Sequence, residues 1–539
     1  MVPDDGPVSG SRSRRETLKQ IGGGLALATL AGCMGGDSSE QTSKGDSPTG
    51  GSASGGSSKL RAALVGSVNI RTFDPPNVSL DATMRALYGV YEGLTTYDEN
   101  MGVQPQLATE WEKVDDTSIR FTLKEGVTFH DGSEMTAEDV KFSLERYASP
   151  DVQKYSYWST LESVEVEGDH EVVITTEMPF APLLSFLTGN SRSGGHIMPK
   201  GSSPEDLSTQ PVGTGPYQFE SYQEQSKIVL SKFDDYHVDG VPHVDTVEVP
   251  IIPEKSTAVS ALRSGDVDMI DRVPSQTLDT LRKDGDISLP TIKGGLAFRC
   301  IMFNNTTEPF DDEKVRLAFA KGFRNKDIID NVMNGEAVNA TGPIPTSHEM
   351  YSELPHHQKY DPERSLELIE ESSYSLSEIQ GMDLEMLTWG SGFWYQFAKI
   401  AATQIGATLD TEFTVTSIPY QKAFTQVDEL SYDMISWGWK GLTAADSYVY
   451  QYHEDGGRNK YRGYSNDRVN ELADKARSTF DPDEQREIYK EAQDIIARTA
   501  ADAFIFHPNL YIAHQNSVSG FEITPQSEYI GQLVDVKKS

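Results

Sequence analysis

The sequence predicts a mixed α/β protein with more than one lobe, and three observations support that prediction. The chain has 539 residues, enough for about three domains of roughly 150 residues each. Short β-branched runs typical of strands are mixed with helix starts that carry capping residues. The chain is 37% apolar and contains six tryptophans and 21 phenylalanines. It can therefore bury a core, and disorder is not the expected state.

The charge balance excludes one class of partner and indicates a salty environment. There are 82 acidic and 47 basic residues, so the formal charge is −35. A nucleic acid is a polyanion that proteins bind through Lys and Arg, and this surface would repel it. The acids also repel one another, and salt weakens that repulsion because the Debye length falls to about 3 Å at 1 M. Since the acids are spread along the whole chain, we expect a halophilic surface rather than a cation-binding site.

The first 33 residues read as an export signal. The segment Ser13–Lys19 contains two adjacent arginines and resembles a twin-arginine signal, with Thr17 in place of the usual aromatic residue. The apolar stretch 21–31 has about half the roughly 20 residues that a membrane-spanning helix needs. It leads into Leu-Ala-Gly-Cys33, which resembles a lipobox. We expect Cys33 to carry a lipid that anchors the protein to the outer, extracytoplasmic face of the cytoplasmic membrane.

A flexible tether and a single internal cysteine follow. Residues 34–59 include Gly, Ser or Thr at 17 of 26 positions, and as a random coil such a segment spans roughly 28 Å. The only other cysteine is Cys300, in the apolar run 296–303. With Cys33 lipidated, no intramolecular disulfide is possible. We expect Cys300 to be a buried strand residue rather than a nucleophile.

Strand and helix patterns follow in turn along the rest of the chain. Ile119, Phe121 and Leu123 alternate as on a half-buried strand. Further β-branched runs, which also predict strands, occupy residues 172–176, 228–230 and 247–252.

Three helix starts are marked by their capping residues. Thr136 followed by Asp139 resembles a capping box. Asp361 and Asp481 each precede a proline, which suits the N-cap and first positions of a helix. The apolar residues that follow at helical spacing are Val140, Leu144 and Tyr147 after the first start, and Ile488, Ala492 and Ile495 after the third.

Motifs of common surface enzymes and of other transporter subunits do not occur in the sequence. After residue 59 there is no phosphate loop, no stretch of 18 apolar residues, no Gly-x-Ser-x-Gly elbow and no His-Glu-x-x-His zinc motif. Pairs of acids are expected as solvated surface in so acidic a chain. His130, Asp131 and Glu134 lie at a turn before a capped helix, which favours a turn over a metal site. We therefore expect no catalytic residues, no metal and no cofactor.

Several short blocks, in order along the chain, carry a resemblance to a known family. They read FDP at 73–75, YEGL at 91–94, PQLA at 105–108, FHDG at 129–132, TAEDV at 136–140, SLER at 143–146, PVGTGPY at 211–217 and PFDD at 309–312. On these blocks the chain resembles the family 5 extracytoplasmic solute-binding proteins of ABC importers. This group includes dipeptide, oligopeptide and nickel binders.

The resemblance implies a periplasmic-binding-protein-like fold of two α/β lobes that close on a solute about a hinge. The first lobe, enlarged by an inserted subdomain, would span residues 60–297 and the second 298–504. Residues 505–539 would return to the first lobe. We expect the crossings near 297–304 and 503–508. The implied partners are a small-molecule or peptide solute and the permease and ATPase subunits of the importer.

Two aromatic clusters with adjacent glycines are the candidate ligand site. Glycines beside aromatic residues suit a close backbone approach to a ligand that lies against flat rings. The alternative is that these rings fill the core of the second lobe. The family uses the segment resembling 437–446 to hold its ligand. Together with Phe73 and Asp74 of the first block, the expected ligand-binding residues are Trp389, Phe393, Trp394, Tyr395, Trp437, Gly438, Trp439 and Asp446.

The same segment departs from the dipeptide-binding pattern at both charged anchors. Leu442 stands where that pattern has an Asp for the amino group of the peptide, with Asp446 nearby, and no Arg occurs between Arg364 and Arg458. Burying an uncompensated charge costs several kcal/mol, so a zwitterionic dipeptide is disfavoured. We expect an oligopeptide-type solute that tolerates blocked termini. A neutral oligosaccharide on the same fold, or a surface-anchored hydrolase, remains as an alternative.

Overall fold

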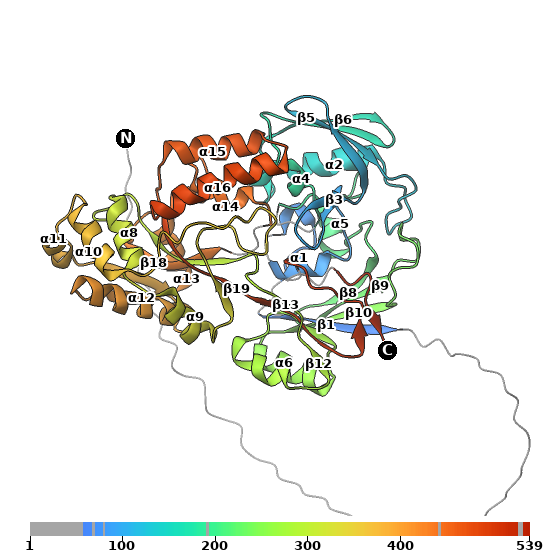
Figure 1. Ribbon diagram of the computed structural model, residues 1–539. Coiled ribbons are helices and arrows are strands. Elements are labelled where there is room, and N and C mark those ends of the chain that lie inside the picture. The colour runs from blue at the N-terminus through green and yellow to red at the C-terminus, as the bar shows by residue number, and fades with distance from the viewer. Residues whose placement is uncertain (1–57, 67–69, 79–80, 190–192, 440–442, 527–531) are drawn as a thin grey trace, which may run out of the picture. The chain divides into compact units, whose positions relative to one another are not determined.

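The computed structural model describes residues 58–66, 70–78, 81–189, 193–439, 443–526 and 532–539. The expected twin-arginine segment, Cys33, nearly all of the tether 34–59 and Leu442 lie outside these residues. In the described part of the chain, no helix is both long enough and apolar enough to cross a bilayer. Three larger sheets organise the described elements, which Figure 1 labels.

The first sheet is mixed and has seven strands from both ends of the described chain. Its central strand β1 runs parallel to β10 and β11, and the other neighbouring pairs are antiparallel. Four consecutive positions of β1, residues 62–65, are almost fully buried, as expected of a strand covered on both faces. The sheet order is β12 (Ile287–Ser288), β21 (Ala513–Gln515), β11 (Met269–Ile270), β1 (Lys59–Val65), β10 (Thr246–Ile252), β9 (Lys227–Lys232) and β8 (Tyr217–Gln223).

The second sheet has four antiparallel strands and is covered by helix α2 (Ala137–Tyr147). Its order is β4 (Ala108–Lys113), β5 (Ser118–Leu123), β7 (Glu171–Thr176) and β6 (Leu161–Gly168). The backbone N–H of Thr136 donates to the Asp139 carboxylate at 2.8 Å, which confirms the predicted capping contact. Val140, Leu144 and Tyr147 of α2 are fully buried. We call residues 58–289 and 512–539, which carry these two sheets, lobe I.

The third sheet has six strands and belongs to residues 298–508, which we call lobe II. Its order is β15 (Ala337–Asn339), β19 (Asp502–Pro508), β14 (Phe298–Phe303), β18 (Met434–Trp439), β16 (Glu385–Trp389) and β17 (Thr414–Ile418). Successive residues of β14 enter different cores, Cys300 on one face and Ile301 on the other. Cys300 is fully buried in this strand, as predicted.

Helices cover both faces of the six-stranded sheet. Asp361 and Asp481 accept backbone N–H bonds at the starts of α10 and α16, which confirms the predicted caps. Helices α15 and α16 pack side by side (Figure 1). The helices of lobe II are α8 (Glu313–Lys321), α9 (Asn325–Met333), α10 (Pro362–Glu370), α11 (Leu376–Gly381), α12 (Phe393–Leu409), α13 (Tyr420–Asp428), α14 (Asp446–Val449), α15 (Asp467–Ser478) and α16 (Pro482–Arg498).

Lobe I also contains further helices and two small ribbons. The helices are α1 (Asp81–Leu87), α3 (Tyr155–Trp158), α4 (Leu183–Phe186), α5 (Pro204–Thr209), α6 (Lys255–Ser264) and α7 (Leu278–Arg282). One ribbon pairs β2 (Thr95–Tyr97) with β3 (Val103–Pro105), and the other pairs β22 (Val518–Ser519) with β23 (Lys537–Lys538).

A two-stranded ribbon joins the sheets of the two lobes. It pairs β13 (Thr291–Ile292) with β20 (Leu510–Tyr511) in antiparallel fashion. Along the chain, β13 lies between β12 of the first sheet and β14 of the third, and β20 lies between β19 and β21. The segments expected to cross, 297–304 and 503–508, are thus central strands of lobe II, and the chain changes sheets just before the first and just after the second.

Candidate functional site

Three parallel strands of lobe II end at the same edge of the six-stranded sheet. β16 runs parallel to both β17 and β18, and Trp389 and Trp439 are the last residues of β16 and β18. Helix α12 begins a few residues after the end of β16, and helix α13 begins just after the end of β17. Strand β14 starts at this edge because it pairs antiparallel with β18. Ligands of α/β sheets bind beyond the carboxyl ends of parallel strands, so the topology favours a site here.

Eight aromatic side chains gather at this edge, and we call them the aromatic cluster. Ring centroids of Trp389 and Trp394 are 4.7 Å apart, those of Trp389 and Trp437 are 6.4 Å apart, and those of Trp437 and Trp439 are 6.1 Å apart. The members are Trp389, Phe393, Trp394, Tyr420, Phe424, Trp437, Trp439 and Tyr461. The sequence predicts five of them, but it does not single out Tyr420, Phe424 or Tyr461.

The aromatic cluster is partly core and partly surface. Trp437 is 4% exposed, whereas Tyr420 is 47% exposed and Trp389, Trp394 and Trp439 are half-buried. Trp437 is therefore a core residue, whereas the other named rings keep exposed surface on which a ligand can lie. The indole Nε1 atoms of Trp389, Trp437 and Trp439 are buried without a hydrogen-bond acceptor in the described structure. Buried indole N–H groups usually have an acceptor, so these donors suit a ligand that brings carbonyl or carboxylate oxygens.

Arg299 lies across Gly438 and brings a positive charge to the aromatic cluster. The two residues face each other in the β14–β18 pairing. A Cβ at position 438 would lie 2.7 Å from Arg299 Cδ and 2.5 Å from the Phe298 carbonyl oxygen. The Arg299 guanidinium stands 5.3 Å from the Trp394 ring centroid, and its Nη1 donates to the carbonyls of Phe298 at 2.9 Å and Trp439 at 3.3 Å. Gly438 therefore makes room for Arg299. This packing explains why position 438 is a glycine without reference to any ligand.

A second arginine lies at the other end of the cluster. The Arg458 guanidinium stands 4.5 Å from the Trp439 ring centroid. Two arginines thus lie at the aromatic cluster although none occurs between Arg364 and Arg458, because strand pairing brings Arg299 in from before that range and Arg458 lies at its end.

Tyr395 is not part of the aromatic cluster. It lines a separate hollow with Lys399 and Thr403 on α12. Two positions along a helix correspond to a rotation of about 200°, so Tyr395 and Phe393 face in different directions.

Phe73 and Asp74 are enclosed by lobe I. The Phe73 ring packs against Phe219 and Tyr222, with centroids 5.2 and 5.4 Å away. The Asp74 carboxylate accepts from Arg146 Nη2 at 3.0 Å and is fully buried. Burial raises the pKa of Asp74 although Arg146 opposes the shift. Neither side chain presents an open face to a solute in this structure.

Asp446 is held by an ion pair inside the protein. Its two carboxylate oxygens accept from Arg477 Nε at 2.8 Å and Nη2 at 2.9 Å, and Asp446 is 4% exposed. The Arg477 guanidinium in turn lies 3.0 Å from the Tyr450 ring centroid. The partner of Asp446 in this structure is therefore Arg477, whereas the sequence suggested that Asp446 pairs with the amino group of a solute.

A small cavity of about 40 Å³ is lined by both lobes. Lobe I contributes Tyr97 and Ser185, and lobe II contributes Glu349 and Thr443. Burial, and secondarily the nearby Asp98 carboxylate, raises the pKa of Glu349 to about 7. The contact between the lobes therefore contains an acid that changes charge near neutral pH.

Comparison with known proteins places this arrangement in a family. Residues 102–461 match the model described as bacterial extracellular solute-binding proteins, family 5 middle. The glutathione-binding protein GsiB of Salmonella typhimurium is 27% identical over 490 residues, covering 87% of this chain and 93% of GsiB.

Solved structures share the fold at lower identity. The oligopeptide-binding protein AppA of Bacillus subtilis, in complex with a nonapeptide, is 23% identical with a TM-score of 0.72 and covers 89% of this chain and 99% of its own. The ABC transporter substrate-binding protein CtaP of Listeria monocytogenes is 20% identical with a TM-score of 0.78, at the same two coverages.

Proposed function

The chain belongs to the bacterial extracellular solute-binding proteins of family 5, and from this premise we propose that it captures a peptide-type solute on the aromatic cluster of lobe II. Such proteins bind solutes for ABC importers and carry out no catalysis, so the hydrolase alternative is set aside. The permease and ATPase subunits of an importer are the corresponding partners.

One observation carries the assignment of the solute class: Arg299 stands on the aromatic cluster. A guanidinium suits a carboxylate because its planar N–H groups match two carboxylate oxygens. The rings beside it suit side chains or backbone amides laid flat against them. Buried indole donors of Trp389, Trp437 and Trp439 suit carbonyl oxygens. A peptide with a free carboxylate offers all three kinds of group.

The names of two relatives agree with that solute class. GsiB is a glutathione-binding protein, and AppA was solved with a nonapeptide. Both ligands are peptides, though of very different length. We therefore propose a peptide longer than a dipeptide, with its carboxylate toward Arg299.

A neutral oligosaccharide is the competing solute. Sugars also stack on tryptophan rings, but a neutral sugar brings no negative charge to a guanidinium. Arg299 and Arg458 thus favour the anionic solute over the neutral one. This reverses the sequence-based expectation that blocked carboxyl termini are tolerated.

A thermal-shift panel at high salt tests the proposal. It compares free dipeptides, longer peptides with free or amidated carboxyl termini, and neutral oligosaccharides. A ligand at a hundredfold excess over Kd stabilises by about 2.7 kcal/mol. We expect stabilisation by longer free-acid peptides. Stabilisation by oligosaccharides alone would assign the other solute class.

Attachment to the membrane is a separate part of the proposal. The lipobox-like sequence ending at Cys33 supports lipid anchoring, and the two arginines within Ser13–Lys19 support twin-arginine export. The formal charge of −35 supports a halophilic environment. Refolding at about 0.1 and 3 M salt tests the last point, and equal stability at both concentrations would contradict it.

A further inference from the structure

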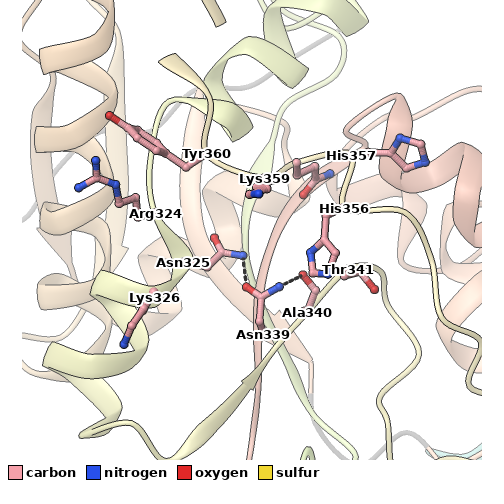
Figure 2. A pocket seen from close by; sticks show the side chains of 11 residues that line it. Arg324, Asn325, Lys326, Asn339, Ala340, Thr341, His356, His357, Lys359 and Tyr360 are labelled. Carbon is pink, nitrogen blue, oxygen red and sulfur yellow. Dashed lines mark hydrogen bonds between the residues drawn. The ribbon is translucent and has the colours of Figure 1, made fainter. Parts of the chain in front are cut away.

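A second hollow of lobe II lies on other elements than the aromatic cluster. It has a volume of about 310 Å³ and is formed by the start of α9, the end of β15 and the loop before α10. Figure 2 shows the side chains that surround it. None of the residues expected to bind the solute lines it. We call it the α9 pocket.

The lining of the α9 pocket is basic although the chain is strongly acidic. Five of its eleven lining residues are Arg, Lys or His, and none is Asp or Glu, whereas the whole chain has 82 acids, 47 Lys and Arg residues and 11 His residues. The basic members are Arg324, Lys326, His356, His357 and Lys359. A concave lining of one charge sign focuses the potential and attracts ions of the opposite sign.

Two of the five basic groups are compensated by acids outside the pocket. Lys326 Nζ lies 2.5 Å from Asp330, and His357 Nε2 lies 2.7 Å from Asp494. Figure 2 shows His357 directed away from the other labelled side chains. Arg324 and Lys359, by contrast, form no ion pair with a carboxylate anywhere among the described residues. Their positive charges are therefore available to an anion.

Arg324 also breaks a local rule of helix capping. It is the N-cap of α9 and offers no side-chain acceptor, whereas Asp312, Asp361 and Asp481 cap α8, α10 and α16 with carboxylates. A cation at this end of a helix adds to the partial positive charge that is already there. An anion in the pocket would compensate both charges.

Neighbouring contacts hold the polar groups of the pocket in place. The Arg324 guanidinium lies 4.3 Å from the Tyr360 ring centroid. The Asn325 amide donates to Asn339 at 2.8 Å and to the Phe504 carbonyl at 3.0 Å, and the first of these bonds is drawn in Figure 2. A lining that is already ordered loses less conformational entropy when it binds.

We propose that the α9 pocket binds a phosphate group, carried by a small phosphorylated molecule or by a lipid headgroup. Phosphate presents several acceptor oxygens in different directions. It can therefore accept hydrogen bonds from basic groups of two separate segments of the lining, the start of α9 and the loop before α10. The 310 Å³ volume also leaves room for the group that carries the phosphate.

Titration of the full chain at constant ionic strength tests this site. The probes are inorganic phosphate and glycerol phosphate, each compared with chloride. Arg324→Gln and Lys359→Gln each remove one pocket charge, and Lys475→Gln removes one charge from α15 as the matched control. We expect saturable binding of the phosphate probes that weakens at least tenfold in each pocket variant and is unchanged in the control. Peptide binding should be unchanged in all three, so this test is independent of the proposed function.

Flotation with vesicles distinguishes the two sources of phosphate. Vesicles of phosphatidylglycerol are compared with vesicles of phosphatidylcholine, using protein without the lipid anchor. Binding to phosphatidylglycerol that is lost in Arg324→Gln assigns the headgroup, and binding of glycerol phosphate without vesicle binding assigns the free molecule. Absence of saturable binding to any probe, or equal weakening in Lys475→Gln, would overturn the proposal.

Discussion

Arg299 and Gly438 face each other across the β14–β18 pairing, and the missing side chain of the glycine is what lets the arginine lie there. This contact has two consequences. A charged group reaches the aromatic cluster, and the strand carrying two of the cluster's tryptophans keeps its register. We therefore expect solute binding and packing to depend on the same contact.

Gly438→Ala should displace Arg299 and weaken solute binding. The added Cβ would meet the Phe298 carbonyl oxygen at 2.5 Å, and overpacking of this kind costs about 1–3 kcal/mol of stability. Thermal unfolding and calorimetric titration measure the two effects. Full affinity in the folded variant would show that Arg299 does not need this position.

Trp394→Ala should weaken solute binding by about ten- to a hundredfold, which corresponds to roughly 1.4–2.8 kcal/mol. The Trp394 ring centroid lies 4.7 Å from that of Trp389 and 5.3 Å from the Arg299 guanidinium, so its removal takes away a stacking surface. Tyr395→Ala is the matched control, because it truncates the next residue of the same helix outside the aromatic cluster. Equal losses in both variants would mean that helix packing, not solute contact, is being measured.

Asp446→Asn should destabilise the protein with little effect on solute affinity. It leaves Arg477 buried without its carboxylate, and breaking a buried ion pair costs about 3–5 kcal/mol. Asp483→Asn is the control, because Asp483 forms an exposed pair with Arg486 and such pairs contribute about 0–1 kcal/mol. A selective loss of affinity for peptides with a free amino group would instead make Asp446 a ligand residue.

Protonation of Glu349 should stabilise the folded protein as the pH falls. Its pKa of about 7 in the folded state lies above its value of about 4.3 in an unfolded chain. Its contribution is therefore complete below about pH 4 and is lost as the pH rises through 7. Glu349→Gln should remove this dependence and raise stability at pH 8 by about 1 kcal/mol, a value reduced for solvent access. If the melting temperatures of the two proteins changed equally with pH between pH 6 and 8, this result would contradict the burial of Glu349.

Cys33→Ser should release folded protein into the medium. The substitution removes the thiol that a lipid would modify, and no described helix can hold the chain in a bilayer. Cell fractionation at high salt measures the distribution. Retention of the variant in the membrane fraction would refute lipid anchoring through Cys33.

Local signals predicted local structure well. The helix starts at Thr136, Asp361 and Asp481 were readable because a cap and the backbone groups that it satisfies lie within four residues. Alternation and β-branched runs likewise located strands such as β5 and β10. Five of the eight residues of the aromatic cluster were readable because they lie near strand ends close together in the sequence.

Contacts between distant segments were not readable in the same way. Arg299 reaches the aromatic cluster through strand pairing, and nothing near it in the sequence indicates its partner. Asp446 looked like a ligand residue because Arg477, which occupies its carboxylate, lies on another helix. Gly438 was assigned to the ligand because the sequence does not show which group packs against a glycine.

Calorimetric titration with a matched peptide pair tests the central claim most directly. The pair is the tightest-binding peptide with a free carboxyl terminus and the same peptide amidated, each titrated into the unaltered protein, Arg299→Gln and the exposed-surface control Arg468→Gln. We predict that the free acid binds at least tenfold more tightly than the amide to the unaltered protein and to the control, because the amide removes the charge that meets Arg299. In Arg299→Gln the two peptides should bind almost equally. Equal binding of both peptides to the unaltered protein, or a preference for the acid that survives in Arg299→Gln, would contradict the account.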